Sequence, residues 1–445
     1  MAPMQAQSHS LEARILHGES LRKQMPRTSQ AEWHPKQRNY KPLDLLLMQV
    51  RGRVAELLPI KWGRMAASPF GFFRGSTAIM AADLALCGST GFCVQMYGDA
   101  HVRNLGAYAV HDDRLVFDAN DFDETCQGPW EWDVKRMATS IVLAGREAGH
   151  ADDVCRQAVL DFVSLYGRRM AEFSGAPLIE VARTFVHRHL TSQPITHALM
   201  KAERSSPMAN LEKLTKNGAR GARIFKETKP LLRRVTTARS REVIASLRPY
   251  RETLGEEAKH LFDRYRPVDV SFKVVGTGSV GVRDYIVLFF GNGEHDPLFL
   301  QIKEEPPSAY TPHLPGQRPV LNEGHRVVIG QKMLQAECDM LLGWTSIQGR
   351  DYLVRQLADH KSSLETEDLA GSGLHDYAQV CGEIMSKGHA RAGDAAVIHG
   401  YIGTGNKFAQ AVADFAIAYA DQATKDHAQL LAAVRSGRLR AQRGV

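Results

Sequence analysis

Strand-like sequence is confined to two places in this chain of 445 residues, and helical periodicity dominates elsewhere. The first place holds one strand and a hairpin, and the second holds three longer strands followed by a short one. The expected strands are, in chain order, 92–96, 105–110, 115–119, 268–275, 285–290, 298–302 and 352–356. This distribution predicts an α+β fold with a mostly helical large lobe and a small antiparallel sheet lobe.

The same pattern divides the chain into four segments. We expect an N-terminal arm laid on the surface or partly disordered, a helical lobe, a sheet lobe, and C-terminal helices that complete the helical lobe. Their boundaries are 1–42, 43–265, 266–360 and 361–445. Within them we expect helices at 43–58, 77–86 and 323–342, a turn-rich stretch at 68–75, and helix with breaks from 132 to 261.

Composition excludes several classes of protein. No apolar run approaches the roughly 18 residues of a membrane span, and the first residues lack the apolar stretch of a secretory signal. The six cysteines are scattered without a CxxC pair, which indicates neither a zinc site nor a disulfide framework. We therefore expect a cytoplasmic protein that does not bind membranes.

Positive charge is concentrated between Lys201 and Glu242, where twelve Lys or Arg residues accompany four acids. Such a run is usually a solvated helical face. It is also the composition of a surface that binds nucleic acid or phosphate-rich ligands. The solvated face is the more usual role of such a run, and nucleic-acid binding stays open as an alternative.

A first group of polar residues follows the strand at 92–96. Asp99, His101 and Asn104 form a D-x-H-x-x-N pattern, and Asp121 and Asp123 follow seventeen and nineteen residues after Asn104. Phosphoryl transfer needs a carboxylate at the acceptor hydroxyl and oxygen ligands for Mg²⁺. The spacing from Asp99 to Asn104 is that of a kinase catalytic loop. Taken alone, these residues could also form a polar turn and a solvated hairpin end.

A second group lies between two strands of the predicted sheet lobe. Gly276, Gly278, Ser279 and Gly281 belong to a GxGxxG turn, and Lys303 lies on a strand 22 residues further on. Glycines in a hairpin let the backbone approach phosphates, and a lysine on the following strand can reach them. The bland alternatives are a tight turn and a surface lysine.

The GxGxxG turn also allows a dinucleotide-binding interpretation. That fold requires a helix after the third glycine, whereas the residues that follow here, VRDYIVLFF, are strand-like. Asp296, twenty residues after the first glycine, keeps the spacing of that motif. The missing helix disfavours the dinucleotide interpretation.

These motifs resemble those of a known group of enzymes. GDAHVRN resembles the catalytic loop of aminoglycoside and choline phosphotransferases, and DFDETCQGPWEWDV resembles their metal-binding segment, with one residue missing around Gly128 and Pro129. The resemblance implies a protein-kinase-like fold. It also implies that Asp133 starts a helix and accepts hydrogen bonds from the catalytic-loop backbone. Asp133 would then matter for stability, and Asp99 for activity alone.

Most of the chain is also similar to an uncharacterised bacterial family, domain of unknown function 2252. The segments that carry this similarity include SPFGFFRG, GDAHVRNLG, VVGTGSVGVRDY, RVVIGQKMLQAECDMLLGW and GHARAGD. This resemblance implies no activity.

The order of the two groups is the reverse of that in kinases, where the glycine-rich hairpin and lysine precede the catalytic loop. A circular permutation would explain the reversal, since chains tolerate a cut at the surface. The segment MSKGHARAG near the C-terminus resembles the end of the helix that runs into the catalytic loop of such enzymes.

The resemblance implies transfer from ATP, with Mg²⁺, to an acceptor hydroxyl. Asp99 would be the base, Lys303 would neutralise phosphates, and Asn104 and Asp121 would hold Mg²⁺ with help from Asp123 or Asp118. Only twelve residues separate Asp121 from the next motif aspartate, which leaves no long peptide-docking segment. The expected acceptor is therefore a small molecule, gripped by residues 151–261.

Some roles and some functions stay open. His101 contacts metal or phosphate, or orients the loop, and Arg74 binds phosphate or braces the loop. The acidic partner of the lysine is either Glu323 or Glu337, and Trp130 is expected in the core with Trp132. Alternative functions are nucleotidyl transfer, nucleotide binding without catalysis, and nucleic-acid binding.

Overall fold

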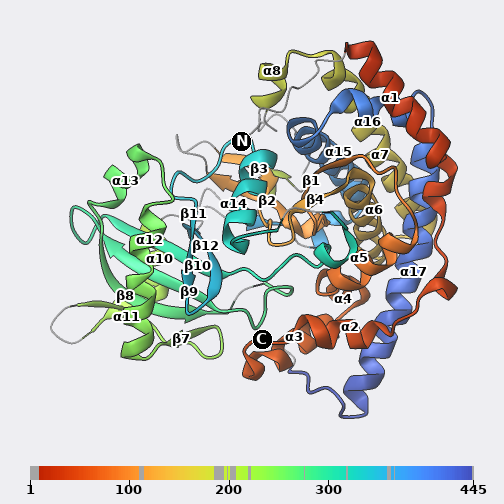
Figure 1. Cartoon of the computed structure of the whole chain (residues 1–445). Coiled ribbons are helices and arrows are strands. Elements are labelled where there is room, and N and C mark those ends of the chain that lie inside the picture. The colour runs from red at the N-terminus through yellow and green to blue at the C-terminus, as the bar shows by residue number, and fades with distance from the viewer. Residues whose placement is uncertain are drawn as a thin grey trace.

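The computed structural model describes residues 10–109, 115–184, 195–197, 199–200, 207–218, 222–274, 276–316, 319–357, 362–364 and 366–442. The protein is a mixed α+β structure in which a large helical lobe and a smaller lobe built on a sheet lie side by side (Figure 1). In the described part of the chain, no helix is both long and apolar enough to cross a membrane.

The helical lobe combines both ends of the chain. Its core is α6, whose residues from Trp130 to Gly145 are all buried. Trp130 and Trp132 are in the core, as expected, with exposed fractions of 0% and 4%. The described helices of this lobe are α1 (Leu11–Gln24), α2 (Pro42–Gln49), α3 (Leu58–Met65), α4 (Pro69–Arg74), α5 (Thr77–Leu86), α6 (Trp130–Glu147), α7 (Asp152–Gly175), α8 (Leu178–Ala182), α15 (Gly373–Ala392), α16 (Ala395–Ile402) and α17 (Lys407–Arg435).

Short strands in the helical lobe hold the loops of interest. β1 (Cys93–Met96) pairs antiparallel with β4 (Cys126–Pro129), and β2 (Leu105–Ala109) pairs with β3 (Leu115–Ala119). β13 (Ser362–Ser363) adds to the edge of β2. The loop 97–104 and the segment 120–125 therefore leave neighbouring strands and lie close together.

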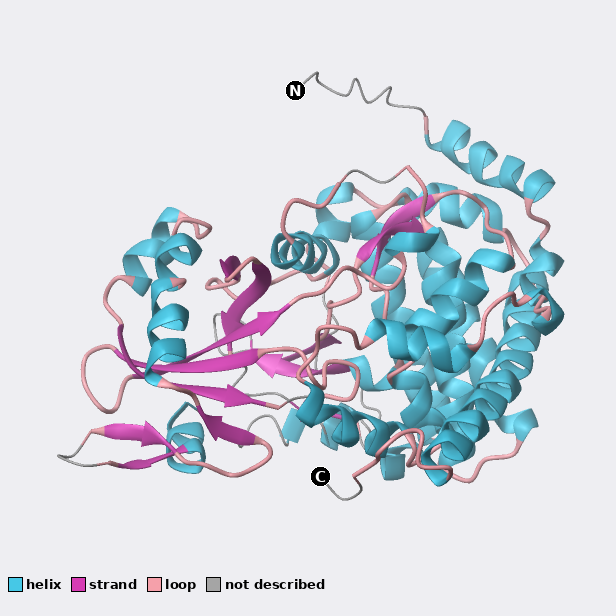
Figure 2. Cartoon of the chain, turned by 60° about the horizontal axis from the view of Figure 1, so that its bottom comes forward, coloured by secondary structure: helices cyan, strands magenta, loops and turns pink. Residues whose placement is uncertain are grey.

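The sheet lobe is built on six antiparallel strands in the order β11-β12-β10-β9-β8-β7. Figure 2 shows the strands of this lobe in magenta, beside the mostly cyan helical lobe. Alternate residues of β9 pack on opposite faces, as strand geometry requires. Helices α11, α12 and α13 cover one face, and α10 covers the other. The bounds are β7 (Leu232–Arg234), β8 (Arg266–Lys273), β9 (Asp284–Phe290), β10 (Pro297–Glu304), β11 (Gly343–Ile347), β12 (Arg350–Gln356), α10 (Pro207–Leu214), α11 (Thr237–Ala245), α12 (Leu247–Arg251) and α13 (Glu256–Phe262).

Helix α14 (Glu323–Leu334) lies at the boundary of the lobes. It contacts β11 and β12 on one side and α15 and β1 on the other. The predicted helix at 323–342 therefore ends early, because the chain must turn back into β11, a strand that periodicity did not reveal.

The predicted lobe boundary at 265 is wrong. Residues 207–262 pack on the sheet, because Val243, Leu247 and Tyr250 bury their side chains against β9 and β10. The segment is also not wholly helical. The strands β5 (Thr215–Asn217) and β6 (Arg223–Phe225) form a pair, and β7 extends the sheet.

The expected N-terminal arm contains α1, which packs on α16. Two other local predictions near the N-terminus need correction. The expected helix at 43–58 ends at Gln49, and a turn around Gly52 and a short 3-10 helix (Ala55–Leu57) lead into α3. The expected turn-rich stretch is α4, because Ser68 caps the helix by accepting the N–H of Gly71, and Pro69 occupies the first turn.

Candidate functional site

A polar cavity lies where loops of the helical lobe meet the glycine-rich turn of the sheet lobe. Residues from three separate parts of the chain surround it. They are Gln49, Arg53, Arg74, Gly75, Thr77, Asp99, His101, Asn104, Asp121, Asp123, Glu124, Gly276, Thr277, Gly278, Ser279, Val282 and Pro306. The structure thus brings both predicted groups of polar residues to one place.

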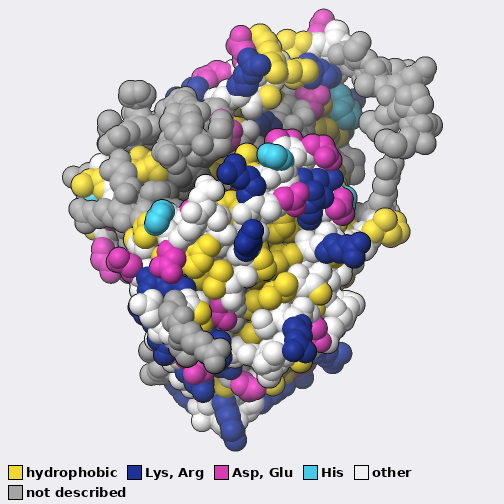
Figure 3. All heavy atoms as spheres, turned by 90° about the vertical axis from the view of Figure 1, so that its left-hand side faces the viewer, with side chains coloured by type: hydrophobic (Ala, Val, Ile, Leu, Met, Phe, Trp, Pro, Cys, Tyr) yellow, Lys and Arg dark blue, Asp and Glu magenta, His cyan; other side chains and the backbone are white. Residues whose placement is uncertain are grey.

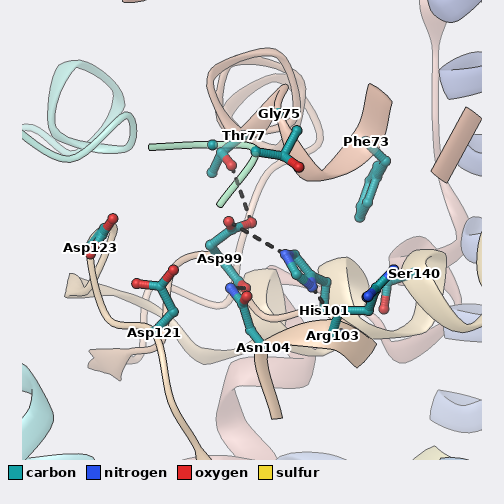
Figure 4. A network of polar contacts seen from close by, with 12 residues as sticks. Phe73, Gly75, Thr77, Asp99, His101, Arg103, Asn104, Asp121, Asp123 and Ser140 are labelled. Carbon is teal, nitrogen blue, oxygen red and sulfur yellow. Dashed lines mark hydrogen bonds and ion pairs between the residues drawn. The ribbon is translucent and has the colours of Figure 1, made fainter. Parts of the chain in front are cut away.

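Asp99 projects into this cavity from the loop after β1 (Figure 4). Arg136, fully buried in α6, donates to it through Nε at 2.8 Å and also through Nη2. Thr77 donates its hydroxyl to the same carboxylate oxygen at 3.2 Å. Burial alone would raise the pKa of Asp99, but the charge and hydrogen bonds of Arg136, together with His101, lower it. Asp99 is therefore an ionised, oriented acceptor.

His101 and Asn104 shape the loop around Asp99. His101 accepts the N–H of Arg103 at Nδ1 (3.2 Å), and burial lowers its pKa to about 3, so the ring is neutral at pH 7. Its Nε2 lies 3.7 Å from Asp99. Asn104 donates its side-chain N–H to the Asp99 carbonyl at 2.9 Å. That bond commits the amide nitrogen and leaves the amide oxygen as a donor atom for a metal.

Asp133 supports the same loop from below. Its carboxylate accepts the backbone N–H groups of Tyr97 (2.6 Å) and Gly98 (2.9 Å), and it is fully buried at the start of α6. His389 of α15 lies 3.2 Å from the same carboxylate and 2.8 Å from the hydroxyl of Tyr166. The prediction of a buried carboxylate under the loop backbone is confirmed.

Asp121 and Asp123 contact Lys303 of the sheet lobe. The Lys303 ammonium is paired with Asp123 and lies 3.6 Å from Asp121, and Ser279 donates its hydroxyl to Asp123 at 2.9 Å. Burial would lower the pKa of Lys303, but the two carboxylates raise it above its ordinary value. Between the aspartates, Phe122 is buried and stacks on Tyr97, which fixes the segment.

Other predicted residues lie elsewhere. Asp118 accepts the N–H of Ala119 and faces Arg391 at 3.8 Å, and it does not line the cavity. Glu323 pairs with Arg326 at 2.5 Å rather than with Lys303. The other expected partner, Glu337, lies beyond the end of α14. Neither glutamate is the observed partner of Lys303.

The carboxylate of Glu305 lies close to this cluster. It is 3% exposed, and neither of its side-chain oxygens receives a hydrogen bond from the described residues. Burial and the charge of Asp123 raise its pKa well above the ordinary range. Glu305 follows the last residue of β10, two residues after Lys303.

The glycine-rich turn is held by cations of the N-terminal segment. Lys61 in α3 is fully buried, and its ammonium lies 3.4 Å and 3.2 Å from the carbonyls of Thr277 and Gly278. Arg53 donates to the carbonyl of Val280 at 2.9 Å, and Arg64 donates to that of Gly276. Gly276 and Gly281 have φ of 56° and 92°, values that favour glycine.

Sequence reasoning missed Arg136 and Lys61. Each is a charged residue inside a run that becomes fully buried, and a buried charge is found with a partner. A charge on the apolar side of a helical pattern was the available signal for both. Their partners could not be found that way, because Lys61 contacts the turn more than 200 residues away.

The donor atoms fit a magnesium ion. Among the residues that the structure describes, no three His, Cys, Asp or Glu side chains are arranged as a ready-made metal site. Mg²⁺ does not need one, because it takes one or two carboxylates and completes its shell with water and substrate phosphates. Asp121, Asp123 and the amide oxygen of Asn104 line the cavity and supply such ligands.

The fold and this cavity define a two-lobed α+β protein with a polar site between its lobes. The chain belongs to the family described as "Uncharacterized protein conserved in bacteria (DUF2252)", whose model matches residues 53–433. No curated protein matches the chain. No solved structure matches it either.

Proposed function

We propose that this protein is an ATP- and Mg²⁺-dependent phosphotransferase with a circularly permuted, protein-kinase-like fold. It transfers phosphate to a hydroxyl of a small molecule. One observation carries the proposal: Lys303 contacts Asp123, 180 residues away along the chain, and also Asp121. A lysine on the strand after a glycine-rich hairpin thereby meets the expected metal carboxylates, next to Asp99 and Asn104.

The packing of α15 supports the permutation. A side chain at Gly388 would collide with the hydroxyl of Tyr97, and one at Gly393 would collide with Val94. The end of α15 therefore lies directly against the strand that leads into the loop of Asp99. In an unpermuted chain the same helix would run into this loop, and its position beside the loop therefore supports the proposed permutation.

The residues around the cavity divide the chemistry. The carboxylate of Asp99 orients the acceptor hydroxyl. The hydroxyl oxygen attacks the γ-phosphorus, the bond to the β–γ bridging oxygen breaks, and ADP leaves with the bonding electrons. The hydroxyl proton passes to Asp99 and then to water. Because the transition state is loose, a weakly basic, well-placed carboxylate suffices.

The nucleotide is held from both lobes in this scheme. The backbone of Gly276, Gly278 and Ser279 covers its phosphates, and Lys303 neutralises them. Asn104 and Asp121, with Asp123, would hold Mg²⁺, which when bound neutralises the charge that develops on the phosphate oxygens. Lys303 would exchange part of its contact with the two aspartates for phosphate oxygens.

The acceptor is a small molecule in this proposal. The segment after Asp123 enters β4 and α6 at once and leaves no long loop on which a peptide could dock. Nucleotidyl transfer and nucleotide binding without catalysis remain the alternatives on the same site. Nucleic-acid binding stays the alternative for the positive segment, in whose described part Arg233, Arg234 and Arg239 pair with acids. On the visible face, basic side chains are mixed with acidic and hydrophobic ones (Figure 3).

The test is calorimetric titration with Mg²⁺ and a non-hydrolysable ATP analogue. Asp121→Asn should weaken binding by about tenfold or more, which is about 1.4 kcal/mol, whereas Asp99→Asn should weaken it by less than about threefold. Asp118→Asn is the matched control, because that carboxylate faces Arg391 outside the cavity. Failure of the wild-type protein to bind the analogue would refute the proposal, and equal losses in the first two variants would refute the assigned roles.

A further inference from the structure

Arg74 stands apart from the other arginines around the cavity. Arg136 is committed to Asp99, and Arg53 and Arg64 are committed to carbonyls of the glycine-rich turn. Arg74 lines the cavity, its side chain makes no hydrogen bond or ion pair within the described chain, and its Nε is buried without a partner. The Arg74 side chain is therefore available to bind a ligand.

The backbone of Arg74 lies beside the glycine-rich turn. The carbonyl oxygen of Arg74 is 3.5 Å from the position of a Cβ on Gly278, at the tip of the glycine-rich turn. Three residues later, Thr77 donates its hydroxyl to Asp99. The segment 74–77 thus runs from the glycine-rich turn to the catalytic carboxylate, and the close-up shows Gly75 and Thr77 above Asp99 (Figure 4). Arg74 lines the space between the two.

The charges around Arg74 favour an anionic ligand. Burial and the neighbouring Arg103 lower the pKa of Arg74 to about 10, which leaves it charged at neutral pH but poorly compensated. Its nearest acid in the cavity, Asp99, already receives the Arg136 guanidinium. A buried or half-buried arginine without a carboxylate is stabilised by phosphate oxygens, which its planar fork can bind in pairs.

We propose that Arg74 binds the γ-phosphate of the nucleotide and stabilises the phosphoryl group during transfer. This inference rests on the proposed phosphotransferase function, and it narrows the two roles expected for Arg74 from the sequence to contact with one phosphate, the terminal one. Two parallel N–H groups of the guanidinium would meet two oxygens of the terminal phosphate, opposite the metal-binding aspartates. The Arg74 guanidinium would then distinguish ATP from ADP.

A purely bracing role for the side chain does not fit the contacts. The part of Arg74 that approaches the glycine-rich turn is its backbone carbonyl, and the buried ammonium of Lys61 lies 3.5 Å and 3.2 Å from the carbonyls of Gly75 and Gly278. These contacts survive substitution of the Arg74 side chain. Arg74→Gln therefore removes the charge and leaves the brace.

The experiment compares two ligands on the same variants. Affinities for Mg²⁺ with a non-hydrolysable ATP analogue and for Mg²⁺ with ADP are measured by calorimetry. Arg74→Gln should weaken binding of the analogue about tenfold and binding of ADP less than about twofold, and Arg74→Lys should recover part of the loss. Arg146→Gln, which removes an arginine paired with Asp152 and Asp421 on the surface, should change neither affinity.

The outcomes separate this inference from the function on which it rests. If wild type binds neither ligand, the phosphotransferase proposal fails, and this inference fails with it. If wild type binds both and Arg74→Gln weakens both equally or neither, only the contact to the γ-phosphate is refuted. A thermal melt accompanies each variant. Should Arg74→Gln melt well below wild type, Arg74→Lys decides, because it must show the same selective loss for the ATP analogue.

Discussion

The two halves of the cavity are held in place by different means. On the helical side, buried side chains with paired charges fix the loop: Asp133 binds its backbone, and Arg136 binds Asp99. On the sheet side, the glycine-rich turn is fixed through its own carbonyls, which receive long cationic side chains such as Lys61 and Arg53.

This difference means that the two halves of the cavity should respond differently to substitution. A carboxylate or guanidinium buried in a core leaves an uncompensated charge or orphaned donors when its partner is removed. The glycine-rich turn borders a cavity. When one cationic side chain is removed, water can therefore hydrogen-bond to the carbonyl that it contacted. Substitutions on the helical side should therefore lower stability, and those on the sheet side should change ligand affinity.

Asp99→Ala tests the first half of this contrast with the largest expected effect. The substitution leaves the fully buried guanidinium of Arg136 without its carboxylate, and we expect the free energy of unfolding to fall by about 3 kcal/mol. Denaturant unfolding measures it. The sequence suggested a residue that matters for activity alone, and the ion pair with Arg136 changes that expectation.

A double substitution sharpens this prediction. Asp99→Ala combined with Arg136→Met removes both charges, so the double variant should be less destabilised than the sum of the two single variants. Additive losses would mean that the pair contributes nothing as a pair. Asp99→Asn, which keeps an oxygen toward Arg136, should lie between wild type and Asp99→Ala.

Asp133→Ala should cost about 2 kcal/mol of stability. It orphans the buried N–H groups of Tyr97 and Gly98, at roughly 1–3 kcal/mol for an unsatisfied buried donor. Asp152→Ala is the control: that acid also lies in the first turn of a helix, but it is exposed and worth about 0.3–1 kcal/mol there. Thermal melts of equal size for the two variants would contradict a supporting role for Asp133.

His101 gives the helical half a pH dependence. It faces Asp99 and Phe70, with the charges of Arg74, Arg136 and Asp121 nearby. Its pKa falls from 6.5 to about 3 on folding, mainly through burial. The unfolded chain therefore binds the extra proton first, and the stability contributed by the neutral ring is complete above pH 6.5 and is lost as pH falls toward 3.

We therefore expect wild type to lose about 1 kcal/mol more stability than His101→Asn between pH 6.5 and pH 5.5. Asparagine can accept the N–H of Arg103 as the ring does, but it does not titrate. Urea unfolding at the two pH values measures the difference. Parallel losses in both proteins would show that His101 is not the group that titrates.

Sequence reasoning located the loop strands and the sheet more accurately than the contacts between them. The apolar runs in Leu115–Ala119 and Asp284–Phe290 predicted β3 and β9 closely, because β-branched and aromatic residues are enriched in buried strands. β11 was missed because the strand Gly343–Ile347 has only five residues before a tight turn, which is too short for periodicity to detect.

The candidate site was predictable to the extent that its residues occur in spaced motifs. Asp133 was placed under the loop because its offset from Asp121 matched a known pattern. The pairing of Arg136 with Asp99 and the tethering by Lys61 depend on which helix packs where, and that is a tertiary outcome. The acidic partner of Lys303 was sought in the helix expected at 323–342, whereas the structure supplies it from Asp121 and Asp123.

Lys61→Met, with the smallest expected effect, probes the sheet half of the comparison. Burial lowers the pKa of Lys61 well below its ordinary value, so its ammonium is costly to keep charged. Methionine fills a similar volume without that cost, and stability should change little. The turn loses its contacts to the carbonyls of Thr277 and Gly278, and nucleotide affinity should fall by about fivefold, or about 1 kcal/mol.

Lys135→Met is the matched control, because Lys135 is equally buried but lies over the ring of Phe415, away from the cavity. Calorimetric titration should show the loss in the first variant alone. A large drop in melting temperature for Lys61→Met with unchanged affinity would reverse the contrast, and it would make the sheet half as dependent on a buried charge as the helical half.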